Sequence, residues 1–364
     1  MVLAFLLFPF LLLLFDTDIR RTFPMSKIVE FFQAFQYGFM QRALFSSIII
    51  GIVCSIIGVF VLLRGMVFLG QAIAHSSFAG ATLGILIGVE NPLLLIMGFS
   101  ILSALGIGYV NQKQIMRDEV IIGIVFSFFI ALAALFIGLQ KEYTSDIKSV
   151  LFGNLLTVDR EDFILLVIYS ALVLVVLFLI KKELYFITFD AELANISGIP
   201  VALLNYVFLI LVSITIAVSL KAIGAILVFA MIVTPAAAAY QWTFKLNKMI
   251  GLSVIFGVSS SLVGLFLSYI LDLASAASIA TTVSLVFFVS FAFSPKRRSL
   301  KKLSGECPFC KKFFDETGHC PNPECIFGDI EHIHNAEKIE IQKKALLKKE
   351  PLVHHHEHKK EPEE

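Results

Sequence analysis

Four cysteines late in the chain have the spacing of a zinc site. They follow the pattern Cys307-x2-Cys310-x9-Cys320-x4-Cys325, which places two pairs of thiols on either side of a short loop. Four thiolates complete the tetrahedral shell that Zn²⁺ prefers, and a segment too small for a core of its own can take its folding energy from the metal. The sequence therefore predicts a zinc-ribbon-like unit over about 304–330 that holds a structural zinc ion.

Histidines after these cysteines indicate a second, looser metal-binding segment. Seven of the eight histidines lie from position 319 onward. Neutral imidazoles can hold metal ions transiently. The residues expected to buffer metal in this way are His332, His334, His354, His355, His356 and His358. A solvated polar tail without any metal-binding role is the alternative.

The remaining histidine lies in the otherwise apolar stretch "GQAIAHSSFAG", residues 70–80. On a helix, Gln71, His75 and Thr82 share one face. An ionisable residue within a membrane span usually points into the helix bundle or into a water-filled cavity. We therefore expect these three residues to line a translocation path. The alternative is that His75 only donates or accepts a hydrogen bond between helices.

A neighbouring face of the same predicted helix carries only small residues. They recur every three or four positions and are Gly70, Ala74, Ser77, Ala81, Gly84 and Gly88. Small side chains let the backbones of two spans approach closely. This face is predicted to pack against other helices.

The composition requires that these residues be positioned by a membrane-spanning helical body. The chain is 58% hydrophobic and 16% charged, with a mean hydropathy of +0.87, whereas soluble domains are about 45–50% apolar and about 25% charged. A span needs roughly 20 mostly apolar residues. We expect an all-α polytopic protein with eight or nine core spans within the apolar runs 43–63, 67–89, 93–110, 120–139, 163–180, 202–219, 222–240, 250–271 and 274–293.

Three regions follow from this pattern. Residues 1–37 contain the apolar stretch "MVLAFLLFPFLLLLF" and a linker. This stretch lacks a basic segment and a small-residue cleavage site, so it is expected to be a short span or uncleaved anchor. Residues 38–294 form the transmembrane domain, and residues 295–364 form the polar Cys/His-rich tail.

Lysine and arginine residues between the runs predict which side faces the cytoplasm, because cytoplasmic loops are enriched in them. If the basic stretch "PKRRSLKK" that opens the tail is cytoplasmic, the loops on the same side contain Lys245, Lys248, Lys181, Lys182, Lys113, Arg117 and Arg64. On the other side only the 140–162 loop departs from the trend. We expect a multi-pass protein of the cytoplasmic membrane with its tail in the cytoplasm.

The segment "KKELYFITFDAELANISGIP", residues 181–200, differs from the spans around it. It is amphipathic, lies on the predicted cytoplasmic side, and ends in Gly198 and Pro200, which terminate helices. A short helix between two spans in this place is predicted to be a docking element.

The motifs resemble the membrane permeases of the metal-uptake branch of ABC importers, which serve zinc, manganese or iron. The resemblance rests on "RGMVFLGQAIAHSSFAGATLGI", "RDEVIIGIVFS", "LFGNLLTVDREDF", "FDAELANISGIP" and "AIGAILVFAMIVTPAAAAY", in this order over about residues 38–293. After "SYILDL" such permeases often have a Pro-x-x-Gly-like turn, whereas "ASAAS" follows here.

The resemblance implies a transport subunit without catalysis of its own. Two copies would pair with two cytoplasmic ATPase subunits and receive metal from an extracytoplasmic binding protein. It also implies that the 190–198 segment contacts the ATPase, with charge from Asp190 and Glu192, close approach at Ala191 and Ala194, and Gly198 at the helix end. A solvated connector is the alternative. Independently, the chain has no G-x-x-x-x-G-K-[ST] phosphate loop, so it is expected to bind no nucleotide and not to be an enzyme.

Two other kinds of transporter stay open on the residues alone. A gradient-driven secondary transporter or channel would need ionisable residues within the spans, and beyond His75 these are nearly absent. A permease for chelated metal, such as a siderophore or cobalamin, is disfavoured by the thiols and imidazoles of the tail, which suit zinc ions. Zinc and manganese are the expected cargoes, and no nucleic-acid partner is expected.

Overall fold

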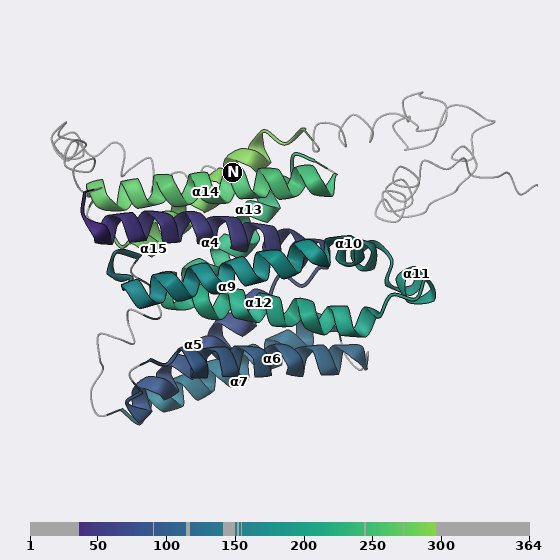
Figure 1. The fold of residues 1–364 in the computed structure, drawn as a ribbon, viewed down its shortest axis with the longest axis horizontal. Coiled ribbons are helices and arrows are strands. Elements are labelled where there is room, and N and C mark those ends of the chain that lie inside the picture. Colours follow the sequence, from purple (N-terminus) through teal and green to yellow (C-terminus); the bar gives the residue numbers. More distant parts are fainter. Residues whose placement is uncertain are drawn as a thin grey trace, which may run out of the picture. The chain divides into compact units, whose positions relative to one another are not determined.

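In the computed structural model, the residues that the structure describes are 36–89, 91–113, 117–140, 150, 153, 155–243, 245–271 and 273–295. The N-terminal apolar stretch and the predicted zinc-ribbon-like unit lie outside these residues. Within them, all regular structure is helical, as the composition predicts (Figure 1).

The long helices follow the apolar runs. They are α4 (Gly38–Leu63), α5 (Leu69–Ile87), α6 (Leu93–Gln112), α7 (Asp118–Gly138), α9 (Arg160–Leu179), α12 (Val201–Ile223), α13 (Ala225–Tyr240), α14 (Leu246–Leu271) and α15 (Ser275–Ala292). Shorter elements join them: η1 (Leu155–Thr157), α10 (Lys181–Phe189) and α11 (Ala191–Ile196). Helices suit this composition because a bilayer interior offers no water to backbone polar groups, and a helix pairs those groups internally.

The number of spans differs from the expected eight or nine. Among the described residues, seven helices are long and apolar enough to cross a membrane. The other two expected spans are α5 and α13. Helix α13 has only 16 residues, and α5 has 19 residues but carries a cluster of polar side chains that lowers its hydropathy.

The long helices pack in two groups with α12 between them (Figure 1). In one group, α5 packs against α6 and α7. In the other, α4 packs against α13 and α14, and α15 packs against α13 and α14. Helix α12 contacts α5 and α6 on one side and α9 on the other.

The small-residue face of α5 packs as the sequence predicts over most of its length. Gly70, Ala74, Ser77, Ala81 and Gly84 are all buried. Gly88 is the exception, because it lies beyond the last turn and ends the helix in a left-handed conformation with φ of 76°.

Among the described glycines, the tightest backbone contact lies where α4 crosses α13. A Cβ atom placed on Gly58 would lie 1.8 Å from the carbonyl oxygen of Ile232 and 2.8 Å from its carbonyl carbon. No side chain fits between these backbones without moving one of the helices. The contact therefore requires glycine at position 58.

Gly58→Ala tests this contact. The added methyl group must push α13 away from α4, so we expect a destabilisation of about 1–3 kcal/mol or more, the usual cost of overpacking. Thermal unfolding of the purified full chain in detergent measures the change as a lower melting temperature.

Gly123→Ala in α7 is the matched control, because nothing lies within 4 Å of its added Cβ and alanine favours helix more than glycine does. Equal melting temperatures for the two variants would contradict the assignment of Gly58 as an obligatory contact.

Candidate functional site

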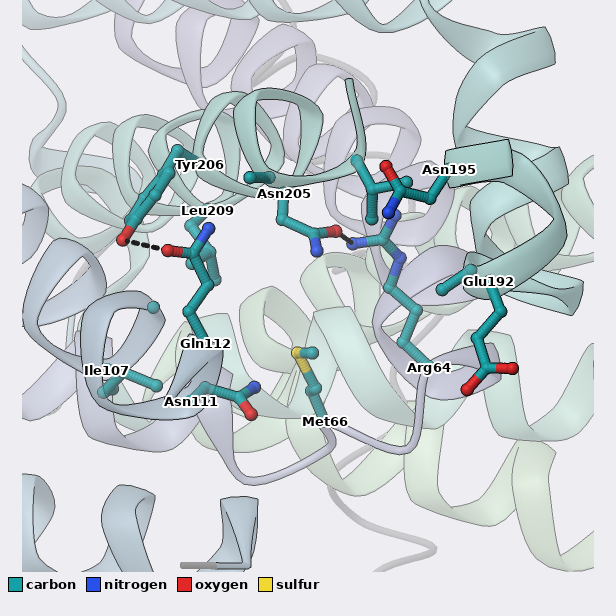
Figure 2. Close-up of a pocket in the computed structure, with 14 residues that line it drawn as sticks. Arg64, Met66, Ile107, Asn111, Gln112, Glu192, Asn195, Asn205, Tyr206 and Leu209 are labelled. Carbon is teal, nitrogen blue, oxygen red and sulfur yellow. Dashed lines mark hydrogen bonds between the residues drawn. The ribbon is translucent and has the colours of Figure 1, made fainter. Parts of the chain in front are cut away.

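A cavity of about 580 Å³ lies at one end of the bundle (Figure 2). We call this end of the bundle the Arg64 end. The cavity is formed where α4 and α6 finish, where α12 begins, and where α11 crosses beside them. Its polar lining comes from Arg64, Asn111, Gln112, Glu192, Asn195, Asn205 and the hydroxyl of Tyr206. The cavity therefore lies directly beside the predicted docking segment.

Arg64 joins three elements around this cavity. Its Nη1 donates to Oδ1 of Asn205 on α12 at 2.9 Å, and its Nε donates to Oγ1 of Thr188 on α10 at 3.4 Å. The guanidinium carbon lies 4.6 Å from the centre of the Phe208 ring, a cation–π distance. Arg64 thus connects the end of α4 to both α10 and α12.

The charge of Arg64 is only partly compensated by these contacts. Its Nη2 is buried and has no hydrogen-bond partner among the described residues. Burial lowers the pKa of Arg64 to about 10, so the guanidinium still carries its charge near neutral pH. In Figure 2 the carboxylate of Glu192 points away from this guanidinium. A cationic donor therefore lines the cavity without an acidic partner among the residues that the structure describes.

Across the cavity, a second hydrogen bond joins α12 to α6. The hydroxyl of Tyr206 donates to Oε1 of Gln112 at 3.1 Å (Figure 2). Together with Arg64, this bond fixes the first turns of α12 to the ends of two other helices.

The predicted docking segment forms a short, well-capped helix, α11. Oδ1 of Asp190 accepts a hydrogen bond from the backbone N–H of Leu193 at 2.8 Å, the arrangement of a helix N-cap. At the other end Gly198 has φ of 82°, and the N–H of Ile199 donates to the carbonyl of Ala194. Asp190, which was expected to supply charge, therefore caps the start of α11. Gly198, which was expected to terminate the helix, lies at its C-terminal end.

One residue of this segment is not available to a partner. Ala194 was expected to let the ATPase approach, but its side chain is fully buried against Ile187 and Leu204 of the same chain. This expectation is wrong, because the helical period turns Ala194 toward α10 and α12. Ala191 and Glu192 remain exposed.

The exposed apolar residues of α10 and α11 are the part of this site that sequence reasoning missed. Ile196 is 83% exposed and Leu193 is 49% exposed. On α10, the rings of Tyr185 and Phe189 contact each other with centroids 4.7 Å apart, and both are exposed. Apolar residues at positions 185, 189, 193 and 196, outside any span, were the signal that could have identified this surface.

The predicted path residues lie on α5, but the structure does not place all three in the same surroundings. His75 is half-buried and meets Phe126 of α7 edge to face, with ring centroids 4.9 Å apart. Its Nδ1 is buried without a hydrogen-bond partner among the described residues. Gln71 is half-buried as well, whereas Thr82 is fully buried and its hydroxyl donates to the carbonyl of Ala79 within α5.

At the opposite end of the bundle, an ion pair that sequence reasoning also missed joins α12 to α9. Nζ of Lys221, near the end of α12, lies 2.6 Å from Oδ1 of Asp162 at the start of α9 and donates to Oδ1 of Asn91 at 3.1 Å. A lysine within the apolar run "SLKAIGAI" was the available signal. We call this the Lys221 end.

No group of three or more His, Cys, Asp or Glu side chains converges in a metal-like cluster within the described part of the chain. The predicted zinc ligands Cys307, Cys310, Cys320 and Cys325 lie outside it. So do the histidines expected to buffer metal, His332, His334, His354, His355, His356 and His358.

Comparison with known proteins gives a consistent result over the helical body. The model of the ABC 3 transport family matches residues 36–294. The manganese transport system membrane protein MntC of Listeria innocua is 41% identical over 262 residues, which are 72% of this chain and 93% of that protein. The manganese import system permease protein ScaB of Streptococcus gordonii is 37% identical over 276 residues, 76% of this chain and 99% of the relative.

A more distant relative and a solved structure extend this comparison. The probable iron transport system membrane protein of Haemophilus influenzae is 31% identical over 264 residues, 72% of this chain and 96% of the relative. A chain in the structure of PsaBC from Streptococcus pneumoniae in complex with Fab is 35% identical, with a TM-score of 0.68, over 75% of this chain and 99% of that chain.

Proposed function

The chain belongs to the ABC 3 transport family, and we propose that it is the transmembrane permease subunit of an ATP-driven importer of divalent metal ions. The observation that carries this proposal is the match to permeases named for manganese along nearly their whole length. Manganese is therefore the favoured cargo, with zinc the other candidate. The seven apolar helices are those of a multi-pass membrane protein.

We place the Arg64 end in the cytoplasm and the Lys221 end outside. The basic residues Arg64, Lys113, Lys181 and Lys245 all lie at or beside helix ends on the Arg64 side, and such residues mark the cytoplasmic face. With this orientation α11 faces the cytoplasmic ATPase, and an extracytoplasmic binding protein delivers metal at the Lys221 end. A second copy of the chain completes the importer.

The docking role of α11 is supported by two features: one side of the segment is packed against this chain, and the other side is exposed. Ala194 and Leu204 bury the base of the segment, and the Arg64–Thr188 hydrogen bond holds α10 beside it. Leu193 and Ile196 project outward. Exposed apolar side chains beyond the spans are typical of protein interaction sites, and a partner that covers them removes their apolar surface from water.

Ile196→Asp tests this docking. Because Ile196 is largely exposed, the change should leave membrane insertion and the melting temperature intact. A carboxylate at the interface should prevent the ATPase from co-purifying. Metal uptake should fall at least about tenfold, the loss typical of a hot-spot residue. Asn247→Asp, at an exposed position of α14 near the same end, adds the same charge away from α11 and should have no effect.

Gly198 gives an independent test of the same segment. Nothing lies within 4 Å of an added Cβ, so the cost of Gly198→Leu arises only from φ of 82°, which asparagine tolerates better than leucine does. We expect Gly198→Leu to abolish uptake and Gly198→Asn to retain most of it. Normal uptake in both Ile196→Asp and Gly198→Leu would exclude α11 as the docking element.

For the translocation path, we propose that His75 and Gln71 of α5 lie beside the moving ion. The Nδ1 of His75 supports this role, because it is buried and has no hydrogen-bond partner in the described part of the chain. Thr82 lies on the same face of α5. Its hydroxyl already donates to the carbonyl of Ala79, so Thr82 is placed beside the path without binding the ion through that group.

His75→Leu should reduce manganese uptake about ten- to hundredfold, the loss typical of polar groups near a bound metal. Co-purification of the ATPase should stay normal. Uptake of radioactive manganese by cells and pull-down of the ATPase measure the two effects. Loss of the folded protein instead would favour the packing role against Phe126.

We also propose that the tail binds one structural zinc ion through Cys307, Cys310, Cys320 and Cys325. Six of its seven histidines, named above, hold further metal loosely. The spacing of the thiols supports this proposal, together with the reducing cytoplasm in which free thiols persist.

The purified full chain should contain about one tightly held zinc ion by elemental analysis, as the spacing implies. Cys320→Ser should remove it, because three thiolates leave the shell open. Cys54→Ser changes the buried thiol of α4 and should keep the zinc. Zinc in neither the wild type nor the Cys54→Ser variant, or a disulfide between the tail cysteines, would refute the site.

A further inference from the structure

A groove on the outside of the bundle, toward the Arg64 end, is separate from both the cavity and α5. It has a volume of about 400 Å³ and lies between α4, α9 and α14. We propose that it binds one anionic phospholipid, with an acyl chain in the groove and the headgroup phosphate beside Lys181. This proposal goes beyond the transport function and takes from it only the proposed cytoplasmic orientation of the Arg64 end.

The walls of the groove have the chemistry of an acyl-chain site. They are formed by Ile56 of α4, Ile250 of α14, and the last two turns of α9, which contribute Leu174, Leu177 and Phe178. The volume falls in the range of small-molecule sites, about 300–1,000 Å³. Val175 and Phe178, which also line it, are 58% and 76% exposed, so the groove opens outward from the bundle.

Lys181 is the one charged residue among those that line the groove. It is the first residue of α10 and follows the last residue of α9 by two positions. Lys181 therefore lies at the end of the apolar wall, where its ammonium group is placed to contact the phosphate of a phospholipid headgroup. It is half-buried, so its aliphatic stem lies along the wall.

The surroundings of the groove mouth add positive charge. Lys182 follows Lys181, and Lys245 and Lys248 precede Ile250 in the sequence around the start of α14; all three are exposed. Glu183 in the first turn of α10 is the nearby opposing charge. Basic sites between helices on the cytoplasmic side attract anionic headgroups.

The depth of Lys181 in the bilayer agrees with headgroup contact. Helix α9 ends at Leu179 and the amphipathic α10 begins at Lys181. Trp242 and Tyr185, each 44% exposed, lie at the same end of the bundle, and such aromatic residues mark the membrane–water interface. The mouth of the groove therefore lies at the level of the phosphates.

Native mass spectrometry of the full chain tests this site. The chain is purified in detergent with equal amounts of phosphatidylglycerol and phosphatidylcholine. The wild type should retain one phosphatidylglycerol in preference to phosphatidylcholine. Lys181→Gln should reduce that preference about fivefold, the fold-change that corresponds to roughly 1 kcal/mol per lysine near an anionic surface. Val175→Trp, which fills the groove, should reduce retention of both lipids.

Matched controls separate the groove from general surface charge and bulk. Lys113→Gln removes a lysine at the same end that lies over the Tyr109 ring instead, and Leu172→Trp adds bulk at an exposed position of α9 outside the groove. Both should behave as wild type. Equal retention of the two lipids by the wild type would overturn the proposal. An equal loss of the preference for phosphatidylglycerol in Lys113→Gln and Lys181→Gln would overturn it as well. So would equal lipid retention by Val175→Trp and Leu172→Trp, which is the result expected if a second copy of the chain covers the groove.

Discussion

Close packing of helix backbones is the constraint on which the rest of this structure depends. Lipid tails are as apolar as the side chains of the spans, so helices in a bilayer associate through tight packing and interhelical hydrogen bonds rather than through the hydrophobic effect. At Gly58 the backbones of α4 and α13 meet with no room for a side chain. Serine hydroxyls add bonds between helices: Ser253 of α14 donates to the carbonyl of Ser55 at 3.1 Å, and Ser278 of α15 donates to that of Gly264 at 2.8 Å.

Helix α12 makes polar contacts at both ends of the bundle. With 23 residues, it is about 35 Å long at 1.5 Å per residue. It carries Asn205, which accepts a hydrogen bond from Arg64, at one end and Lys221, which pairs with Asp162, at the other. In the proposed importer, we expect a movement imposed on α11 by the ATPase to reach the outer end along α12, which contacts α11. The ion pair at the Lys221 end and the hydrogen bonds at the Arg64 end are the contacts that such a movement must rearrange.

Much of the fold could be predicted from local properties of the sequence, because length and hydropathy determine a span almost by themselves. The α11 segment could also be predicted from the sequence, since Gly198 and Pro200 are residues that terminate helices. The span count was wrong where local properties conflict: α5 has the length of a span but polar side chains, and α13 is apolar but short. The burial of Ala194 could not be predicted, because it depends on Leu204 of the following helix.

The contacts of the site were beyond sequence reasoning for a related reason. Arg64 bonds to residues 124 and 141 positions away, and Lys221 pairs with a residue 59 positions away, so spacing along the chain gives no indication of either. His75 and Gln71 could be proposed because an intramembrane polar residue is unusual in itself. The engagement of the Thr82 hydroxyl by its own helix required the structure.

Reconstituted transport distinguishes ATP-driven import from gradient-driven import. The full chain and its co-purifying ATPase are placed in vesicles with manganese outside and a manganese-sensitive dye inside, and the binding protein is supplied outside. We expect dye quenching that requires ATP on the α11 side and that is lost when the ATPase is omitted. Manganese uptake of equal rate without ATP, driven by an ion gradient alone, would contradict it.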